Sequence, residues 1–206
     1  MLRAGLTGGI ASGKSTVASV LRKLDVPLLE ADPIGHELLE SGQEAREEIV
    51  REFGGDILDA KGTVDRAKLG AIIFADAEKR ARLDRIVHPR ILGAASKWFA
   101  ALDRPGGPAL GVFSAALIFE TGYNRELGRV IVCWCPTERQ LERLKERGLS
   151  PAEARQRIAA QMPADEKRRL ADDVIDSSGS IEETERQVRE LVERLKGLAA
   201  AGIKRP

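Results

Sequence analysis

The chain has 206 residues, 43% of them hydrophobic, and a formal net charge of +1 at pH 7. This size and apolar content suit one compact α/β domain with a smaller insertion. Charged residues make up 32% of the chain, but they alternate in sign and form no basic block, which argues against electrostatic binding of nucleic acid.

No apolar run reaches the roughly 18 residues that a membrane span needs. The first apolar stretch is too short for a signal peptide and is interrupted by Lys14 and Arg22. We therefore expect a cytoplasmic protein without a membrane partner, and the sequence leaves its oligomeric state open. Cys133 and Cys135 lie in an apolar run, where small buried residues are the simplest interpretation, so we expect neither a disulfide nor a zinc site.

A glycine-rich segment follows the first apolar run, Leu2 to Leu6, which is typical of a short strand. The segment reads Gly8-Gly9-Ile10-Ala11-Ser12-Gly13-Lys14-Ser15-Thr16 and precedes apolar residues at helical spacing. Its spacing matches G-x-x-x-x-G-K-[ST], a loop that binds phosphate through backbone N–H groups and the first helical turn. The alternative is a glycine-rich turn with an unrelated lysine.

The positions of this loop have predicted tasks in binding Mg²⁺ and the phosphates of a nucleotide, although no motif distinguishes ATP from other triphosphates. Gly8 and Gly13 allow backbone angles and close approaches that a Cβ atom would block. Lys14 is expected to reach the β- and γ-phosphates, and Ser15 to offer its hydroxyl to Mg²⁺.

The segment from Val26 to Asp32 is a short apolar run that ends in acid and indicates a second parallel strand. Ligands of such sheets lie beyond the carboxyl ends of the strands, so Glu30 and Asp32 are candidates for a general base or a Mg²⁺ partner. The alternative for Asp32 is a helix N-cap, because Asp32-Pro33 also suits the Ncap and N1 positions.

Residues 33–103 have a helical pattern that is too long for one crossover helix, which predicts a helical insertion able to hold a second substrate. Turns are expected at Gly54-Gly55 and Lys61-Gly62, and Asp65-Arg66 opens one helix. His88-Pro89 is expected to interrupt another helix. His88 either contacts a substrate phosphate or hydroxyl, or caps a helix junction.

Three further strands are expected at Ala109–Phe113, Arg129–Trp134 and Asp173–Asp176, which predicts a doubly wound five-stranded parallel sheet. Between the last two strands, residues 137–148 form a predicted helix with Arg139, Arg143 and Arg147 on one face. These arginines suit a lid, about 137–150, that clamps phosphates. Alternatively, Glu142 and Glu146 neutralise them on a solvated surface. A closing helix is expected at about 182–198.

Together these stretches resemble the dephospho-CoA kinases of the P-loop kinase superfamily over nearly the whole chain. The segments that carry the resemblance are Leu6–Ser15, Glu30–Asp32, Gly62–Arg66 with Leu69, His88–Ile91, Leu117–Gly122, Gln140–Arg143 with Arg147, Arg157 with Gln161, and Ala171–Asp176 with Gly179. The chain departs from the family pattern at five positions. It has Glu30 for an aspartate, Ala11 for a glycine, Ser114 and Ala116 for an aspartate and a proline, and Ser177 for an asparagine.

The resemblance implies transfer of the γ-phosphoryl group of ATP to the 3′-hydroxyl of dephospho-CoA, which gives CoA and ADP. It implies a P-loop kinase core at 1–32 and 104–206, with an acceptor-binding insertion at 33–103. Asp32, Lys14 and Arg143 would be catalytic, and Arg139, Arg143 and Arg147 would join the loop residues in binding ATP. The acceptor would contact Glu30, Asp32, Arg66, His88 and Glu120.

Two other functions remain as alternatives. One is a P-loop kinase acting on a nucleoside monophosphate or a small alcohol, although the long insertion with Asp65-Arg66 and His88-Pro89 favours dephospho-CoA. The other is a nucleotide-dependent switch, which the absence of an Asn-Lys-x-Asp motif makes a poor match.

Overall fold

The computed structural model describes residues 1–40 and 44–202. The chain divides into two compact units: Met1–Leu29 with the residues from Trp98 onward, and Glu30–Lys97. The sequence placed these boundaries at 32/33 and 103/104, so Glu30 and Asp32 fall in the second unit and the end of the last helix of the insertion falls in the first. The expected ranges also contain residues 41–43 and 203–206, which lie outside the described residues.

A five-stranded sheet forms the centre of the first unit. Its strands are β1 (Leu2–Thr7), β2 (Leu28–Glu30), β3 (Leu110–Ser114), β4 (Arg129–Trp134) and β5 (Asp173–Asp176), in the order β2-β3-β1-β4-β5. β1 pairs in parallel with β3 and β4, and β4 pairs in parallel with β5. The predicted doubly wound parallel sheet is therefore confirmed, although β2 is shorter than the apolar run that indicated it.

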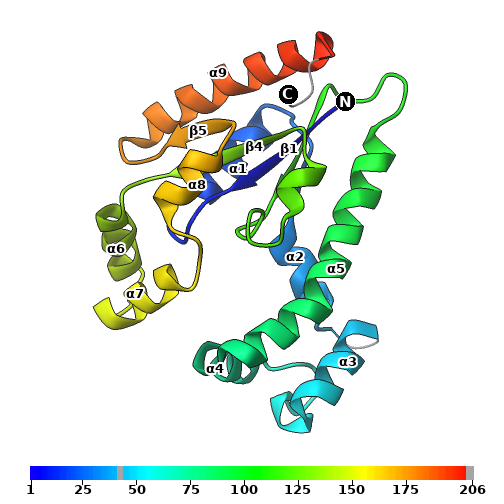
Figure 1. Cartoon of the computed structure of the whole chain (residues 1–206), viewed down its shortest axis with the longest axis vertical. Helices are drawn as coiled ribbons and strands as arrows, with labels where there is room; N and C mark the ends of the chain where they lie inside the picture. The colour runs from blue at the N-terminus through cyan, green and yellow to red at the C-terminus, as the bar shows by residue number, and fades with distance from the viewer. Residues whose placement is uncertain (41–43, 203–206) are drawn as a thin grey trace. The chain divides into compact units, whose positions relative to one another are not determined.

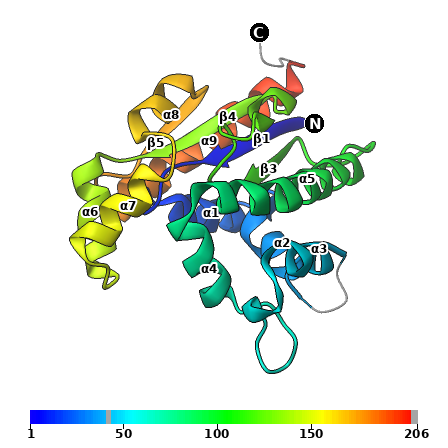
Figure 2. The same ribbon diagram turned by 60° about the horizontal axis from the view of Figure 1, so that its bottom comes forward.

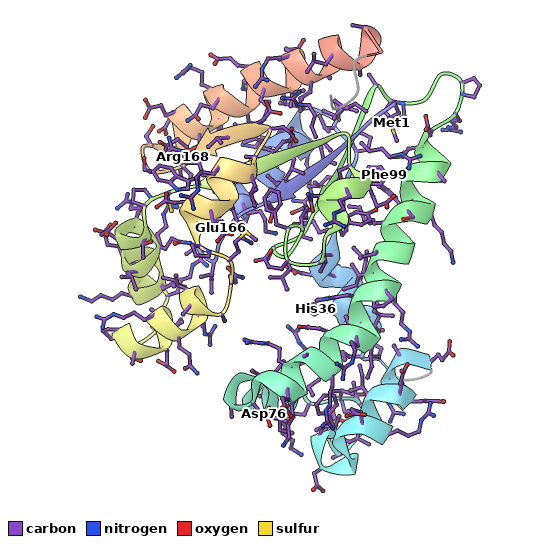
Figure 3. All side chains as sticks on the ribbon, viewed as in Figure 1. Met1, His36, Asp76, Phe99, Glu166 and Arg168 are labelled. Atoms are coloured by element: carbon purple, nitrogen blue, oxygen red, sulfur yellow. The ribbon has the colours of Figure 1, made fainter. Side chains whose placement is uncertain are left out.

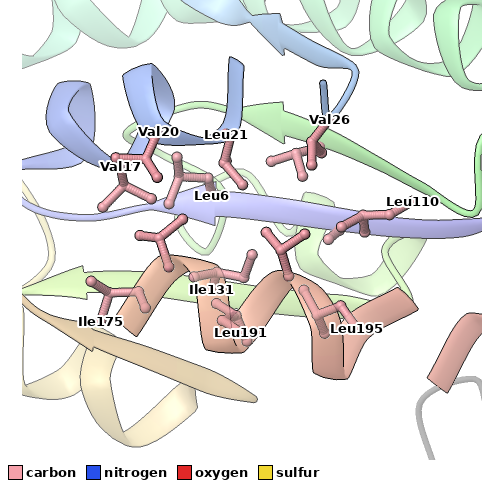
Figure 4. Packing of buried hydrophobic residues seen from close by; sticks show 14 of the residues in the cluster. Leu6, Val17, Val20, Leu21, Val26, Leu110, Ile131, Ile175, Leu191 and Leu195 are labelled. Carbon is pink, nitrogen blue, oxygen red and sulfur yellow. The ribbon is translucent and has the colours of Figure 1, made fainter. Parts of the chain in front are cut away.

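One face of this sheet packs against two helices, α1 (Lys14–Lys23) and α9 (Ile181–Ala200), which are seen close up in Figure 4. Alternate residues of β1 reach this core, because side chains along a strand point to opposite faces. The buried residues include Leu6 of β1, Leu21 of α1 and Leu195 of α9. This packing fixes the end of β1 and the start of α1, between which the glycine-rich loop runs.

Aromatic and aliphatic residues cover the other face of the sheet. Phe113 of β3 packs edge-on against Tyr123, with 5.4 Å between ring centroids. Phe99, near the end of α5 (Ala77–Leu102), is fully buried and lies with Met1 beside Gly111 of β3 (Figure 3). The sheet thus has apolar cover on both faces, as parallel sheets require.

Three short helices lie between β4 and β5: α6 (Thr137–Glu146), α7 (Pro151–Ala159) and α8 (Ala164–Leu170). Figures 1 and 2 both show α6 beside α7. α7 starts with a capping box in which Ser150 and Glu153 exchange hydrogen bonds. α8 is held at Trp134 of β4, whose indole donates to Asp165 (2.9 Å) and lies 4.2 Å from the guanidinium carbon of Arg168.

The second unit contains α2 (Ala31–Glu37), α3 (Glu44–Phe53), α4 (Arg66–Ala75) and the greater part of α5. Its own core is built around Ile49, Ile57 and Leu69. Asp65 caps α4, accepting hydrogen bonds from the backbone N–H groups of Ala67 (2.9 Å) and Lys68 (3.2 Å), which confirms the predicted helix start.

The prediction that His88-Pro89 interrupts a helix is wrong, because α5 continues through Pro89. A proline inside a helix costs about 3 kcal/mol through its missing N–H group and its steric clash. The remaining hydrogen bonds of this 26-residue helix and the burial of Ile86 offset that cost. In addition, Arg90 donates to the Ile86 carbonyl (2.7 Å) in the turn before the proline and pairs with Glu48 of α3 (2.7 Å).

Among the described residues, the structure has no helix with the length and apolar content of a membrane span. Both cysteines are free and buried, which confirms the prediction that they form no disulfide.

Neither thiol is expected to react with a thiol reagent in the native protein at about pH 8, because the thiolate is the reactive form. Burial raises the pKa of Cys133 to about 12 and also raises the pKa of Cys135. Colorimetric labelling should give no reaction until concentrated guanidinium chloride unfolds the chain and exposes both thiols. Rapid labelling of either thiol in the folded protein would contradict this.

Because native Cys133 keeps its proton to higher pH, unfolding should become easier between pH 9 and about 12.

Replacing Asp173 with alanine should lower the free energy of unfolding by about 3 kcal/mol, because it strips the partner from two arginines. The buried carboxylate of Asp173 accepts from Arg129 (2.7 Å) and Arg194 (2.6 Å), and so ties β5 to β4 and α9. Urea denaturation measures the effect. The matched control is Glu190→Ala, which breaks the exposed pair with Arg186 and should cost less than about 1 kcal/mol. Equal losses in the two variants would refute the interpretation.

Candidate nucleotide-phosphate site

The glycine-rich loop connects the end of β1 to the first residue of α1. Ala11 (φ 58°) and Gly13 (φ 86°) both have left-handed backbone conformations. Left-handed residues that alternate with right-handed ones gather backbone N–H groups into a concave anion site. Gly13 is also the N-cap of α1, and no side chain caps that helix within the described residues. The loop therefore has the shape and the donors that a phosphate group needs.

Gly8 allows the loop to lie directly on β4. A Cβ atom at this position would meet the Cys133 carbonyl oxygen at 2.5 Å and Ser12 Oγ at 2.5 Å. Gly9 is equally confined, since its Cβ atom would meet the amide nitrogen of Gln140 at 2.5 Å. The predicted need for close approach at Gly8 is thus observed in the packing.

The carbonyl side of the loop faces side chains of neighbouring elements. Its bonds are Gln140 Nε2 to Ile10 O (2.6 Å), Arg143 Nη1 to Ala11 O (3.0 Å), and both Cys133 Sγ (2.8 Å) and Ser177 Oγ (2.5 Å) to Ser12 O. The backbone N–H of Ile10 donates in turn to Gln161 Oε1 (2.8 Å). The tip of the loop is therefore held from α6, β4 and the segments that follow α7 and β5.

Lys14 and Ser15 begin α1 at the centre of the site. Lys14 Nζ lies 3.2 Å from the hydroxyl of Ser114, a buried residue at the end of β3. Ser114 occupies the position where the resemblance leads one to expect an aspartate. Ser15 is exposed in the first turn of α1, so its hydroxyl is accessible to a ligand.

A cavity of about 370 Å³ opens beside the loop. It is lined by Ala11, Gly13, Ser15, Thr16, Arg139, Arg143, Arg147, Ser177, Gly179, Ser180, Ile181 and Thr184. The loop, the arginine-bearing helix α6 and the start of α9 thus share one concave space. Its size and its positive charge suit a phosphorylated ligand of small-molecule size.

The arginines of the cavity differ in exposure: Arg139 and Arg147 are exposed, whereas Arg143 is half-buried. Arg139 is exposed and pairs with Glu142 (2.8 Å), whose hydrogen bond raises the pKa of the guanidinium. Arg143 is half-buried and donates to the carbonyl oxygen (2.5 Å) and the hydroxyl (3.3 Å) of Ser177 as well as to the loop. The alternative of a neutralised, solvated helix face is therefore confirmed for Arg139, which pairs with Glu142, and wrong for Arg143, which bonds to the loop and to Ser177.

Glu120 has a structural partner that the sequence did not indicate. Its carboxylate lies 2.8 Å from Nζ of Lys167, a fully buried lysine that also donates to the Ala116 carbonyl (2.6 Å). The same carboxylate accepts from the backbone N–H of Met162 (3.0 Å). Glu120 thus joins the segment after β3 to α8 and to the segment that precedes α8.

The remaining predicted site residues belong to the second unit. Glu30 is the N-cap residue of α2, and Asp32 is an exposed residue within its first turn. The alternative assignment of Asp32 as the N-cap is therefore wrong, because α2 begins before it. Arg66 is exposed at the start of α4.

His88 lies in the interior of α5, 3.4 Å from the carboxylate of Asp84. Burial raises the pKa of Asp84, while the nearby His88 opposes this shift. His88 therefore does not cap a helix junction, and its predicted contact with the acceptor stays a prediction.

The sequence named Gln140, Gln161 and Ser177 only in comparison with the family and did not indicate that they bind the phosphate loop. The helical spacing contained a signal, because Gln140 shares the α6 face of Arg143, Leu144 and Arg147. A polar residue on a face that also carries the buried Leu144 is a candidate for a specific hydrogen bond.

Comparison with known proteins agrees with this geometry. A family model described as dephospho-CoA kinase matches residues 2–183. A dephospho-CoA kinase of Listeria monocytogenes is 43% identical over 195 residues, covering 92% of this chain and 95% of the relative. One from Symbiobacterium thermophilum is 45% identical, covering 89% of this chain and 77% of the relative.

Solved structures have the same architecture. A Thermus thermophilus protein superimposes with a TM-score of 0.78 at 33% identity, covering 94% of this chain and 97% of that one. A Campylobacter jejuni dephospho-CoA kinase gives a TM-score of 0.69 at 27% identity, covering 95% and 97%. An Acinetobacter baumannii shikimate kinase, at 16% identity and a TM-score of 0.54 over 96% and 94% of the chains, shares the fold alone. The phosphate loop, the arginine-lined cavity and these matches lead to one conclusion: the chain belongs to the dephospho-CoA kinase family.

Proposed function

We propose that this protein transfers the γ-phosphoryl group of ATP to the 3′-hydroxyl of the ribose in dephospho-CoA, giving CoA and ADP. The observation that carries the proposal is the phosphate loop with Lys14 at the start of α1, in a chain whose family match spans residues 2–183. In phosphoryl transfer of this kind, the protein mainly positions the reactants and stabilises charge on the transferred group.

Lys14 supplies a mobile positive charge for the β- and γ-phosphates, and the backbone N–H groups of the loop bind the β-phosphate. The exposed hydroxyl of Ser15 suits Mg²⁺, a cation that prefers oxygen ligands. When bound, Mg²⁺ would neutralise charge on the β- and γ-phosphates.

The α6 arginines serve the nucleotide in two different ways in this proposal. Arg139 and Arg147 are exposed at the cavity and stabilise phosphate charge. Arg143 is engaged by the Ala11 carbonyl and by Ser177, and it holds the loop while it adds positive charge. Residues 137–150 act as a lid that clamps the phosphates.

Asp32 orients the acceptor hydroxyl and accepts its proton in this proposal. A carboxylate is a weak base toward an alcohol, so orientation with late proton transfer is its main contribution. The helical insertion holds the acceptor, with contacts from Glu30, Arg66 and His88. Glu120, whose carboxylate also pairs with Lys167, contacts the acceptor as well in this proposal.

Acceptor-dependent ADP release with ATP and Mg²⁺ tests the reaction. We expect turnover with dephospho-CoA and a product whose mass has increased by one phosphoryl group. Nucleoside monophosphates and small alcohols are the comparison acceptors. Turnover only with one of these would overturn the acceptor assignment but keep the phosphate site, and nucleotide binding without any acceptor-dependent turnover would favour a switch.

Changing Asp32 to asparagine should lower kcat by about 10²–10⁴ while the KM for ATP changes little, because the neutral amide orients the hydroxyl less strongly and cannot accept its proton. Steady-state kinetics with each substrate varied in turn measures both constants. Asp25→Asn is the matched control: Asp25 is exposed, and asparagine tolerates its left-handed φ of 53°. If Asp32→Asn keeps the turnover of the control, Asp32 has no part in the chemistry.

A further inference from the structure

Two buried polar side chains, Gln140 and Ser177, contact the backbone of the phosphate loop, and Ser177 also lines the cavity. Gln140 is 2% exposed and donates to the Ile10 carbonyl, and Ser177 is 3% exposed and donates to the Ser12 carbonyl. Both side chains are uncharged, and neither has a role in catalysis in the proposal above. Their shared partner is the loop backbone.

The environment of Gln140 is costly for stability. Its Oε1 atom is buried and has no hydrogen-bond partner within the described part of the chain. Burial of an unpaired acceptor destabilises a folded protein, so an apolar side chain of the same length would be the better choice for stability alone. What the glutamine provides, and an apolar side chain could not, is the hydrogen bond from its Nε2 atom to the Ile10 carbonyl.

The geometry of the peptide bond converts these contacts into an orientation of donors. In a trans peptide, the carbonyl of one residue and the N–H group of the next point in opposite directions. The described chain has no cis peptide, so holding Ile10 O directs the N–H of Ala11, and holding Ser12 O directs the N–H of Gly13. Ala11 and Gly13 both line the cavity.

The intermediate peptide serves the loop itself. Arg143 holds the Ala11 carbonyl, and the following N–H, that of Ser12, donates to the Gly9 carbonyl (3.1 Å). Local preference does not favour this arrangement, since Ala11 has a left-handed conformation that side-chain-bearing residues disfavour. The loop therefore needs anchors outside its own sequence.

We propose that Gln140 and Ser177 are positioning residues for phosphate binding: by holding the carbonyls of Ile10 and Ser12, they aim the N–H groups of Ala11 and Gly13 at the nucleotide phosphates. The inference rests on the proposed function in taking those phosphates to be those of ATP and ADP. Cys133 supports Ser177, because its thiol donates to the same Ser12 carbonyl (2.8 Å).

Calorimetric titration of Gln140→Met and Ser177→Ala with ADP and with inorganic pyrophosphate tests the proposal. Each variant removes one anchoring donor, and Ser177→Ala also removes the hydroxyl that accepts from Arg143 at 3.3 Å. Each should weaken both ligands by at least about fivefold, the usual effect of one such hydrogen bond. Adenosine, which lacks phosphates, should bind as it does to the wild type. Gln140→Met should keep or raise the unfolding temperature, because it also removes the unpaired acceptor.

The matched control is Gln156→Met, at an exposed position of α7, and it should leave all affinities unchanged. Wild-type affinity for ADP and pyrophosphate in both variants would overturn the proposal. An equal loss for adenosine would also overturn it, since the residues would then support the whole site. If Ser177→Ala does not fold, Cys133→Ala removes the second donor to Ser12, and Cys133→Ser should restore affinity.

These titrations contain no acceptor, so they are separate from the assay of the reaction. Failure of the wild type to phosphorylate dephospho-CoA would refute the proposed function and leave the binding results interpretable. Unchanged phosphate binding in the variants would refute the positioning role even where the kinase assay succeeds.

Discussion

The close contact of Gly8 with the backbone of β4 is the constraint on which the site depends. No side chain fits between Gly8 and the Cys133 carbonyl, so the loop lies directly against β4 where it follows β1. Because the loop lies so close to β4, the Cys133 thiol of β4 and the Ser177 hydroxyl after β5 both donate to the Ser12 carbonyl. The sheet order β1-β4-β5 thus brings residues far apart in sequence to one short segment. A substitution at Gly8 would separate all of these contacts at once.

Apolar runs and glycine spacing were sufficient to predict the parallel sheet, the phosphate loop and the helix that follows it. These signals are strong because buried parallel strands are apolar on both faces and because a phosphate loop needs glycine at fixed positions. The Asp65 cap and the fourth strand, Arg129–Trp134, were predicted at the residues where they are found. Local patterns determine such features, so a single sequence contains them.

Features that depend on tertiary contacts were not predictable in this way. The local preference of His88-Pro89 indicates a helix break, but the length of α5, the packing of Ile86 and the donor on Arg90 outweigh it. Asp32-Pro33 looks like a cap and its neighbour, yet α2 begins at Ala31. Likewise, the arginine spacing of α6 indicates a charged face but does not reveal that Arg143 is bound to Ser177. These residues follow β4 and β5, and the pairing of those two strands brings them together.

The surroundings of Trp134 give the protein an internal fluorescent reporter. The chain has only one other tryptophan, Trp98, so a Trp98→Phe protein would emit from a single indole. That indole is bonded to Asp165 and lies under Arg168, both on α8, while the Trp134 carbonyl accepts the backbone N–H of Ser177 (2.8 Å). Because indole emission responds to nearby charge and hydrogen bonding, displacement of α8 would change the wavelength and intensity of the Trp134 emission. Any motion of α8 relative to β4 can thus be followed in solution without an attached dye.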